Sequence, residues 1–362
     1  MGAQVRLGLN LGYLTGDAGD GVTAARVLAQ EADRLGYAVV WAAEAYGSDA
    51  ATVLAYLAAH TSRIDLGSAV FQVPGRSPAL TAMTAATLDA LSGGRFRLGL
   101  GVSGPQVSEG WHGVRFDAPL ARTRQYVDVV RMALRREPVR YAGHHYPLPL
   151  PGGVGKALRL TVHPVRRDLP VYLAAVGPRN LELAGEIADG WLALFLSPEH
   201  AAEQLAHVRR GAERAGHDLT GFDVAATAPL SVADDVGTAA DAVRGYAALY
   251  LGGMGSRERN FYNQLAVRMG YATAAEEVQA SYLAGRQRDA AAAVPLEFLD
   301  ATSLLGRPAR LVERLRAFAA AGVTTLSVMP FGATLDDRVE ALRTLAGAHE
   351  QAAGAQPAGG GR

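Results

Sequence analysis

The stretch Leu66–Ala82, with the sequence LGSAVFQVPGRSPALTA, decides the fold. Its first residues form the short apolar run of a buried strand, and a turn of small residues follows. Ser77 and Pro78 then open a helix, because serine is a preferred N-cap and proline is tolerated at the first helical position. A buried strand that leads directly into a helix predicts one βα unit, with the strand end near Ala69 facing a bound ligand.

The same alternation of short apolar runs and longer amphipathic runs continues along the chain. We expect strands at residues 5–11, 38–41, 64–69, 96–101, 171–175, 190–194, 223–231 and 323–328. Helical patterns intervene at residues 22–35, 49–59, 79–91, 120–136, 180–187, 198–215, 236–251 and 308–321. Eight such units favour an α/β fold, an eight-stranded parallel (β/α)8 TIM barrel, with its site in the loops at the carboxyl ends of the strands.

Chain length and composition favour one large domain. The 362 residues are 49% apolar, which suffices for one large core. We expect a single barrel domain over residues 1–350, with insertions at the barrel mouth over about 139–170, which is rich in proline and glycine, and about 252–301. Residues 351–362 are rich in Ala, Gly and Pro, and we expect a disordered tail there.

Charge and cysteine content exclude several classes of partner and chemistry. Lys+Arg and Asp+Glu balance at 35 each, so no net field favours nucleic acid or an anionic membrane surface. The chain has no cysteine, which excludes disulfides, thiolate metal sites and a cysteine nucleophile. Neither a signal peptide nor a membrane-length apolar run is apparent. We therefore expect a cytoplasmic protein whose partner is a small-molecule substrate.

The segment Gly99–Gly104 satisfies the GxGxxG dinucleotide fingerprint and follows a predicted strand. Pro105 comes next, and no apolar-periodic helix begins before about Leu120, so no helix N-terminus is expected to receive a pyrophosphate. We favour glycines that let a flat ring approach the backbone at a barrel strand end. A Rossmann site and a simple tight turn are the alternatives.

Five motifs together carry a resemblance to a known family. They are Ser77–Ala82 (SPALTA), Ser92–Arg95 (SGGR), Leu173–Asn180 (LAAVGPRN), Ala184–Trp191 (AGEIADGW) and Ala321–Leu326 (AGVTTL). In their order and spacing the chain resembles the bacterial luciferase-like superfamily, with matches spread over roughly residues 5–345. Within it the likeness is to deazaflavin-dependent oxidoreductases of the methylene-tetrahydromethanopterin reductase type.

The resemblance implies a cofactor and a reaction. It implies coenzyme F-420 and hydride transfer between the cofactor C5 and a small organic substrate, such as an imine, an activated C=C or a one-carbon pterin-type adduct. Two alternatives remain, an FMN-dependent monooxygenase and a non-catalytic cofactor-binding barrel. Homo-oligomers, at least dimers, are also implied, and the apolar helices near residues 52–59 and 81–91 offer a face for the contact.

The resemblance also implies where the cofactor lies. A non-prolyl cis peptide at Ala69-Val70 would back the ring, with a trans strand end as the alternative. The loop Gly177–Asn180 would hold a phosphate at a helix N-terminus, although Gly-Pro is also ordinary helix punctuation. The expected cofactor-binding residues are Ala69, Val70, Gly101, Val102, Ser103, Ala174, Ala175, Val176, Gly177, Pro178 and Arg179.

The expected catalytic residues are Glu44, Asn10 and His112. Glu44 follows the second predicted strand, where related enzymes carry an acidic residue near the ring's polar edge; capping of the next helix is the alternative. Asn10 stands where the archaeal reductase has a glutamate, and Gly104 where an acidic residue follows the fourth strand. The proton-transfer role of those carboxylates is therefore not carried over.

Two groups of polar residues remain. Gln106, Glu109, Trp111 and His112 follow the fourth predicted strand and could supply polar groups there. His112 is a candidate acid or base, with a structural histidine as the alternative. His144 and His145 are adjacent, so in extended chain they point to opposite faces, and no third ligand has a diagnostic spacing. We expect no metal site.

Overall fold

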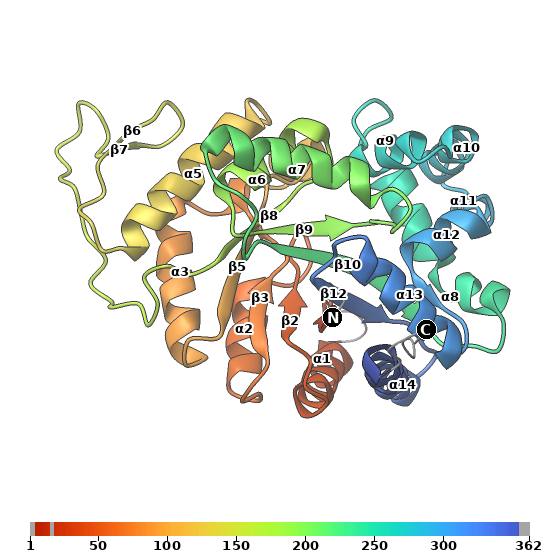
Figure 1. Cartoon of the computed structure of the whole chain (residues 1–362). Coiled ribbons are helices and arrows are strands. Elements are labelled where there is room, and N and C mark those ends of the chain that lie inside the picture. The colour runs from red at the N-terminus through yellow and green to blue at the C-terminus, as the bar shows by residue number, and fades with distance from the viewer. Residues whose placement is uncertain (1–3, 15–17, 355–362) are drawn as a thin grey trace, which may run out of the picture.

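In the computed structural model, which describes residues 4–14 and 18–354, eight parallel strands close into a barrel (Figure 1). The strands are β1 (Arg6–Asn10), β2 (Val39–Ala42), β3 (Asp65–Ser68), β5 (Phe96–Gly101), β8 (Val171–Ala174), β9 (Gly190–Leu194), β10 (Asp223–Ser231) and β12 (Thr325–Pro330). They pair in this order, and β12 pairs with β1 to close the ring. The predicted TIM barrel is confirmed, and the open sheet of a Rossmann fold is excluded.

Helices surround the barrel on its outside (Figure 1). They are α1 (Ala18–Arg34), α2 (Ala50–Ala58), α3 (Pro78–Leu91), α5 (Pro119–Leu134), α6 (Pro178–Ile187), α7 (Ala201–Ala215), α13 (Pro308–Ala320) and α14 (Leu335–Gly354). The side chain of Ser77 accepts a hydrogen bond from the Leu80 backbone N, as an N-cap should. Residues 351–354 belong to α14 and are not disordered, whereas 355–362 lie outside the described residues.

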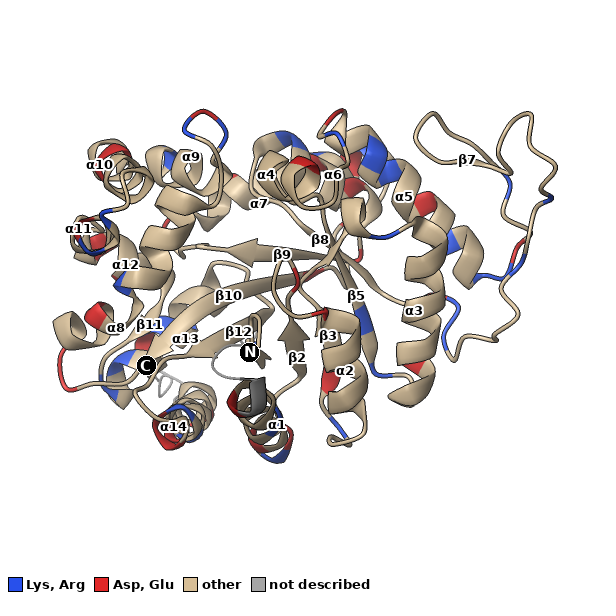
Figure 2. Cartoon of the chain, turned by 180° about the vertical axis from the view of Figure 1, so that it is seen from behind, with Lys and Arg blue, Asp and Glu red and all other residues tan. Residues whose placement is uncertain are grey.

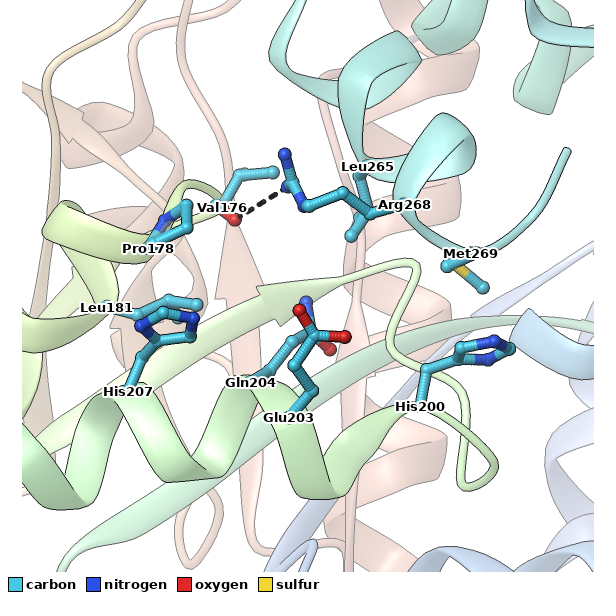
Figure 3. A pocket seen from close by; sticks show the side chains of 10 residues that line it. All are labelled: Val176, Pro178, Leu181, His200, Glu203, Gln204, His207, Leu265, Arg268 and Met269. Atoms are coloured by element: carbon cyan, nitrogen blue, oxygen red, sulfur yellow. Dashed lines mark hydrogen bonds between the residues drawn. The ribbon is translucent and has the colours of Figure 1, made fainter. Parts of the chain in front are cut away.

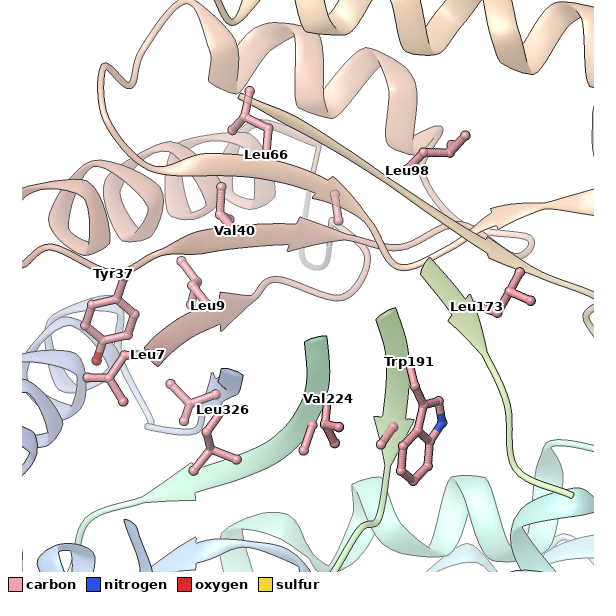
Figure 4. Close-up of a cluster of buried hydrophobic side chains, with 14 of the residues drawn as sticks. Leu7, Leu9, Tyr37, Val40, Leu66, Leu98, Leu173, Trp191, Val224 and Leu326 are labelled. Carbon is pink, nitrogen blue, oxygen red and sulfur yellow. The ribbon is translucent and has the colours of Figure 1, made fainter. Parts of the chain in front are cut away.

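The core lies between the strands and these helices. Large apolar side chains such as Leu9, Leu66 and Leu98 are fully buried there (Figure 4). Inside the barrel, the rings of Trp41 and Tyr172 meet edge to face with centroids 5.3 Å apart. Charged side chains lie mainly on the outer helices, with both signs interspersed on α1 and α14 (Figure 2).

An ionic network closes the amino-terminal end of the barrel. Asp223 at the start of β10 pairs with Arg97 of β5 at 3.1 Å and with Arg6 of β1 at 2.9 Å. Tyr172 also donates a hydrogen bond of 3.0 Å to this carboxylate, and Arg97 pairs with Asp65 at 2.7 Å. A buried carboxylate with this many donors is well compensated. A ligand must therefore enter from the carboxyl ends of the strands.

Two excursions interrupt the barrel. The first contains a short hairpin of β6 (Tyr141–Ala142) and β7 (Pro147–Leu148), which extends away from the barrel beside α5 (Figure 1). The second runs from the end of β10 to α13. It consists of α8 (Val236–Ala248), the π-helical segment η2 (Leu249–Gly253), α9 (Phe261–Arg268), α10 (Ala272–Leu283), α11 (Gln287–Ala292), α12 (Leu296–Thr302) and β11 (Leu304–Leu305).

The second excursion is longer than the sequence indicated. We expected the helix after β10 to be the seventh barrel helix, but α8 packs on α11 and α12, and α13 connects β10 to β12 instead. β11 pairs with the carboxyl end of β10, through Leu230 and Leu304, so the excursion leaves and returns at the barrel mouth. Amphipathic periodicity shows that a helix buries one face but not which partner it packs on.

Three short elements near the mouth were not predicted. They are β4 (Phe71–Gln72), the 3-10 turn η1 (Val73–Gly75) and α4 (Pro105–Gly110). No apolar-periodic helix was expected before about Leu120, and α4, with six residues, is too short to show such periodicity. The inference that no helix N-terminus follows Gly104 is nevertheless wrong, because α4 starts at Pro105.

Candidate active site

A cavity of about 1150 Å³ opens at the carboxyl ends of the strands. Each of the eight strands, or the loop after it, contributes a lining residue: Asn10, Ala43, Ala69, Gly101, Ala174, Leu194, Thr227 and Met329. All eleven expected cofactor-binding residues line this cavity. The expected location of the site at the barrel mouth matches this arrangement.

One wall of the cavity is formed by the chain after β3. The Ala69-Val70 peptide is cis, as the resemblance implied. A Cβ at Gly101 would lie 2.5 Å from Cγ2 of Val70, and one at Gly99 would lie 1.9 Å from the carbonyl oxygen of Ser68. The glycines of β5 therefore make room for the β3 segment. Gly101 also lines the cavity, and the interpretation that these glycines let a flat ring approach the backbone stays a prediction.

Glu44 lines the cavity, and its carboxylate is fully engaged. Arg76 donates from Nε at 3.0 Å and from Nη2 at 3.1 Å, and the backbone N atoms of Gln72 and Ala50 donate at 3.1 and 3.2 Å. Arg76 also lies 4.6 Å from the ring centroid of Phe71. These bonds join the end of β2 to β4 and to the start of α2, which favours the alternative that Glu44 caps a helix and positions the wall.

Asn10 is also held by protein groups. Its amide donates to Thr227 Oγ1 at 3.1 Å, and its carbonyl oxygen accepts from the Gly12 backbone N at 2.9 Å. The side chain lines the cavity but is only 8% exposed. It fixes the loop after β1 against β10.

His112 lies behind the wall and is absent from the residues that line the cavity. Its Nε2 is 2.8 Å from Gln72 Oε1, and Gln72 Nε2 donates to Ser103 Oγ at 2.8 Å. With the Gln72 amide oxygen as acceptor, His112 is the donor from Nε2. It contacts the site through Gln72, a lining residue that the sequence analysis did not single out.

The loop before α6 follows β8 and forms another part of the cavity rim. Gly177 is the N-cap of α6, and nothing lies within 4 Å of the position of a Cβ there. Arg268 of α9 donates from Nη2 to the Val176 carbonyl oxygen at 3.2 Å (Figure 3). Burial lowers the pKa of Arg268. Sequence reasoning missed Arg268, which reaches this loop from the second excursion.

Metal ligands do not gather in the described part of the chain, where no three His, Cys, Asp or Glu side chains are placed to share an ion. None of the helices described is long and apolar enough to cross a membrane.

Comparison with known proteins identifies the family. The family model described as luciferase-like monooxygenase matches residues 8–325. The chain belongs to this family. The suspected bacterial luciferase-like membership is thereby confirmed.

Three relatives illustrate the likeness. The chain is 44% identical over 338 residues, 91% of its length and 96% of the other, to a Mycobacterium tuberculosis protein assigned as a coenzyme F-420-dependent oxidoreductase. It is 29% identical over 296 residues, 81% of its length and 85% of the other, to the 5,10-methylenetetrahydromethanopterin reductase of Archaeoglobus fulgidus. The solved coenzyme F-420-dependent tetrahydromethanopterin reductase of Methanopyrus kandleri superimposes with a TM-score of 0.80, at 26% identity and over 95% and 98% of the two chains.

Proposed function

We propose that this protein is a coenzyme F-420-dependent oxidoreductase acting on a small organic substrate. The observation that carries the proposal is that the Ala69-Val70 wall and the N-terminus of α6 face one cavity. The chain is also 44% identical to a protein assigned as a coenzyme F-420-dependent oxidoreductase. A cavity of this kind at the carboxyl face of a TIM barrel is the expected place for a ligand of cofactor size.

The residues present fit a flat ring that carries a phosphate. Ala69, Val70 and Gly101 offer a wall of small side chains, and Gly177 leaves open space at the start of the ten-residue helix α6. Free backbone N–H groups and the positive dipole end favour a phosphate there. The guanidinium groups of Arg179 and Arg268 also line the cavity and add positive charge.

When bound, the reduced deazaflavin supplies a hydride at C5. The protein's part is to orient the two reactants and exclude water. The Glu44–Arg76 pair and the Gln72–Ser103 bond hold the wall in place, as the hydrogen bonds above describe. Asn10 and Gly104 replace the carboxylates of the archaeal reductase, so proton transfer must use other groups.

The competing assignment is an FMN-dependent monooxygenase, because the family model is described as luciferase-like monooxygenase. Calorimetric titration of the purified protein with coenzyme F-420 and with FMN separates the two. We expect micromolar or tighter binding of coenzyme F-420 and markedly weaker binding of FMN. A clear preference for FMN, with oxygen consumption when reduced FMN is supplied, would overturn the proposal.

We also propose a homodimer that uses the outer faces of α2 and α3. Leu80, Met83 and Leu91 of α3 and Tyr56 of α2 are large apolar side chains with substantial exposure. The mass in solution, measured by light scattering, tests this. A monomer at micromolar concentration would contradict it.

A further inference from the structure

An aromatic wall lies on the side of the cavity opposite the Ala69-Val70 peptide. In the ring, β3 and β10 are separated by β5, β8 and β9 in one direction and by β2, β1 and β12 in the other, so they face each other across the mouth. Ala69 and Val70 follow β3, and the second excursion follows β10. We define the aromatic wall as the lining residues Tyr246, Tyr250, Tyr262 and Phe331.

Phe195, directly after β9, is buried behind this wall and packs against three of its rings. Its ring centroid lies 5.8, 5.5 and 6.1 Å from those of Tyr246, Tyr250 and Tyr262. Phe195 is buried and has a φ of 54°, a left-handed conformation that a bulky residue rarely adopts. Such backbone strain persists only where the surroundings over-determine it, often at a functional site.

Tyr250 occupies the middle of the wall, on the π-helical segment η2. Its ring centroid is 4.8 Å from that of Tyr246 and 4.9 Å from that of Tyr262. Short π-helical segments inside helices often mark functional sites. Gly252 and Gly253 of η2 lie against Tyr282, where a Cβ would come within 2.4 and 2.5 Å of the Tyr282 side chain. The segment is therefore closely packed from behind.

Asn260 connects the segment that carries Tyr250 to the segment that carries Tyr262. Its amide donates to the carbonyl oxygens of Tyr250 and Leu251, both at 2.9 Å. Its side-chain oxygen accepts from the backbone N atoms of Tyr262 and Asn263, at 2.9 and 3.0 Å. Asn260 is 1% exposed, so these four bonds order the wall in the absence of any ligand.

Among the described residues, the tyrosine hydroxyls of the wall have no hydrogen-bonding partner outside the wall. The hydroxyls of Tyr246 and Tyr250 lie within hydrogen-bonding reach of each other. Since all three tyrosines line the cavity, a ligand oxygen there can accept a hydrogen bond from them. Burial raises the pKa of Tyr250 well above its usual value and that of Tyr246 in the same direction, so both stay protonated donors at neutral pH.

The rest of this side of the cavity is apolar. Its further lining residues are Leu249, Met254, Phe261 and Met329. We propose that the aromatic wall is the substrate subsite, that it takes a neutral, largely apolar carbonyl compound, and that Tyr250 donates a hydrogen bond to the carbonyl oxygen. This assignment rests on the proposed function for the source of hydride.

The proposed reaction is the reduction of a ketone by the reduced deazaflavin. Hydride from the reduced deazaflavin forms a C–H bond at the carbonyl carbon, and the C=O π pair moves to oxygen. Tyr250 transfers its proton to that oxygen, which is a stronger base than a phenolate. The phenolate regains a proton from water, and the oxidised cofactor releases one to water. The ketone is reduced to an alcohol and the deazaflavin is oxidised by two electrons. A donor aimed at the developing oxyanion accelerates such a step.

The test uses acetophenone and its oxygen-free isostere α-methylstyrene as probes, on the wild type and on Tyr250→Phe. Tyr271→Phe is the matched control, because Tyr271 packs on Phe298 in the same excursion and is not among the lining residues. Calorimetry measures binding of each probe without cofactor. Turnover of acetophenone is measured with the coenzyme F-420-loaded protein, from the absorbance of the oxidised cofactor.

We expect the wild type and Tyr271→Phe to bind acetophenone about fivefold tighter than α-methylstyrene, the worth of one net hydrogen bond. Tyr250→Phe should bind the two probes equally, lose about 100-fold in kcat and keep its affinity for coenzyme F-420. Equal binding of both probes by the wild type, no binding of either, or full turnover by Tyr250→Phe would overturn the subsite. Selective ketone binding by a protein that does not bind coenzyme F-420 would support the subsite and refute the proposed function.

Discussion

Replacing Gly177 by valine tests the phosphate position most sharply, because the structure predicts that the change affects the ligand and not the fold. No atom lies within 4 Å of a Cβ at this position, and the φ of −85° and ψ of 154° suit a β-branched residue. Valine is a poorer N-cap than glycine by up to about 1 kcal/mol, and the loss of glycine's freedom in the unfolded chain returns about 0.4–1 kcal/mol. We therefore expect the free energy of unfolding to change by less than about 1 kcal/mol.

Affinity for coenzyme F-420 should fall much further. The new side chain would crowd the backbone N–H groups at the start of α6, and one hydrogen bond to a charged group is worth about 1.5–3 kcal/mol. That energy corresponds to a loss of about 10- to 150-fold in Kd. Calorimetry on the variant gives the affinity, and urea denaturation gives the stability.

The matched control is Gly347→Val on α14, which has equally open space and does not line the cavity. It should keep the wild-type Kd, although valine within a helix brings its own small change in stability. If Gly177→Val is folded and binds coenzyme F-420 as tightly as the wild type, the phosphate does not lie at this loop and the reasoning fails.

Three further predictions concern other parts of the chain. Asn260→Ala should lower the free energy of unfolding by about 2–4 kcal/mol, because four backbone groups lose a hydrogen bond, although the Leu251 carbonyl oxygen still accepts from Asn263; a loss below about 1 kcal/mol, measured by urea denaturation, would contradict this. Gly101→Ala should destabilise the fold, and Val70→Ala in the same chain should restore the melting temperature, because the new Cβ would lie 2.5 Å from Val70 Cγ2; no rescue would refute the contact. The Arg34 hydrogen bond lowers the pKa of Glu31 from 4.5 to about 2, so its stabilisation is complete above pH 4.5 and is lost as pH falls toward 2. The melting temperature of Glu31→Gln should fall less than that of the wild type as pH drops across this interval. An equal fall in both proteins would count against the Glu31–Arg34 ion pair.

The sequence predicted several barrel strands well. The bounds of β5, β9 and β10 match the expected ranges, since each is a short run of mostly buried residues. The barrel helix α14 was missed, although its buried Val339, Leu342 and Leu345 have helical spacing. The error at α8 had a different cause, because helix partners depend on tertiary packing that periodicity does not encode.

The candidate site was predictable only in part, for a related reason. The carboxyl ends of parallel strands meet at one face, so Ala69, Gly101 and Ala174 could be brought together from the chain order alone. The partners with which the side chains form hydrogen bonds could not be predicted from the chain order. Glu44 finds Arg76 at a separation of 32 residues, and His112 finds Gln72 at 40. Arg268 reaches Val176 across 92 residues, through an excursion whose path over the mouth no local pattern predicts.

The central claim is the identity of the cofactor, and one competition measurement tests it most directly. Purified protein is titrated with oxidised coenzyme F-420 alone and then in the presence of excess FMN, with binding followed by calorimetry. We expect a Kd for coenzyme F-420 in the micromolar range or below, shifted less than twofold by FMN. Displacement of coenzyme F-420 by equimolar FMN, or binding of FMN alone as tightly as coenzyme F-420, would contradict this and favour the monooxygenase alternative.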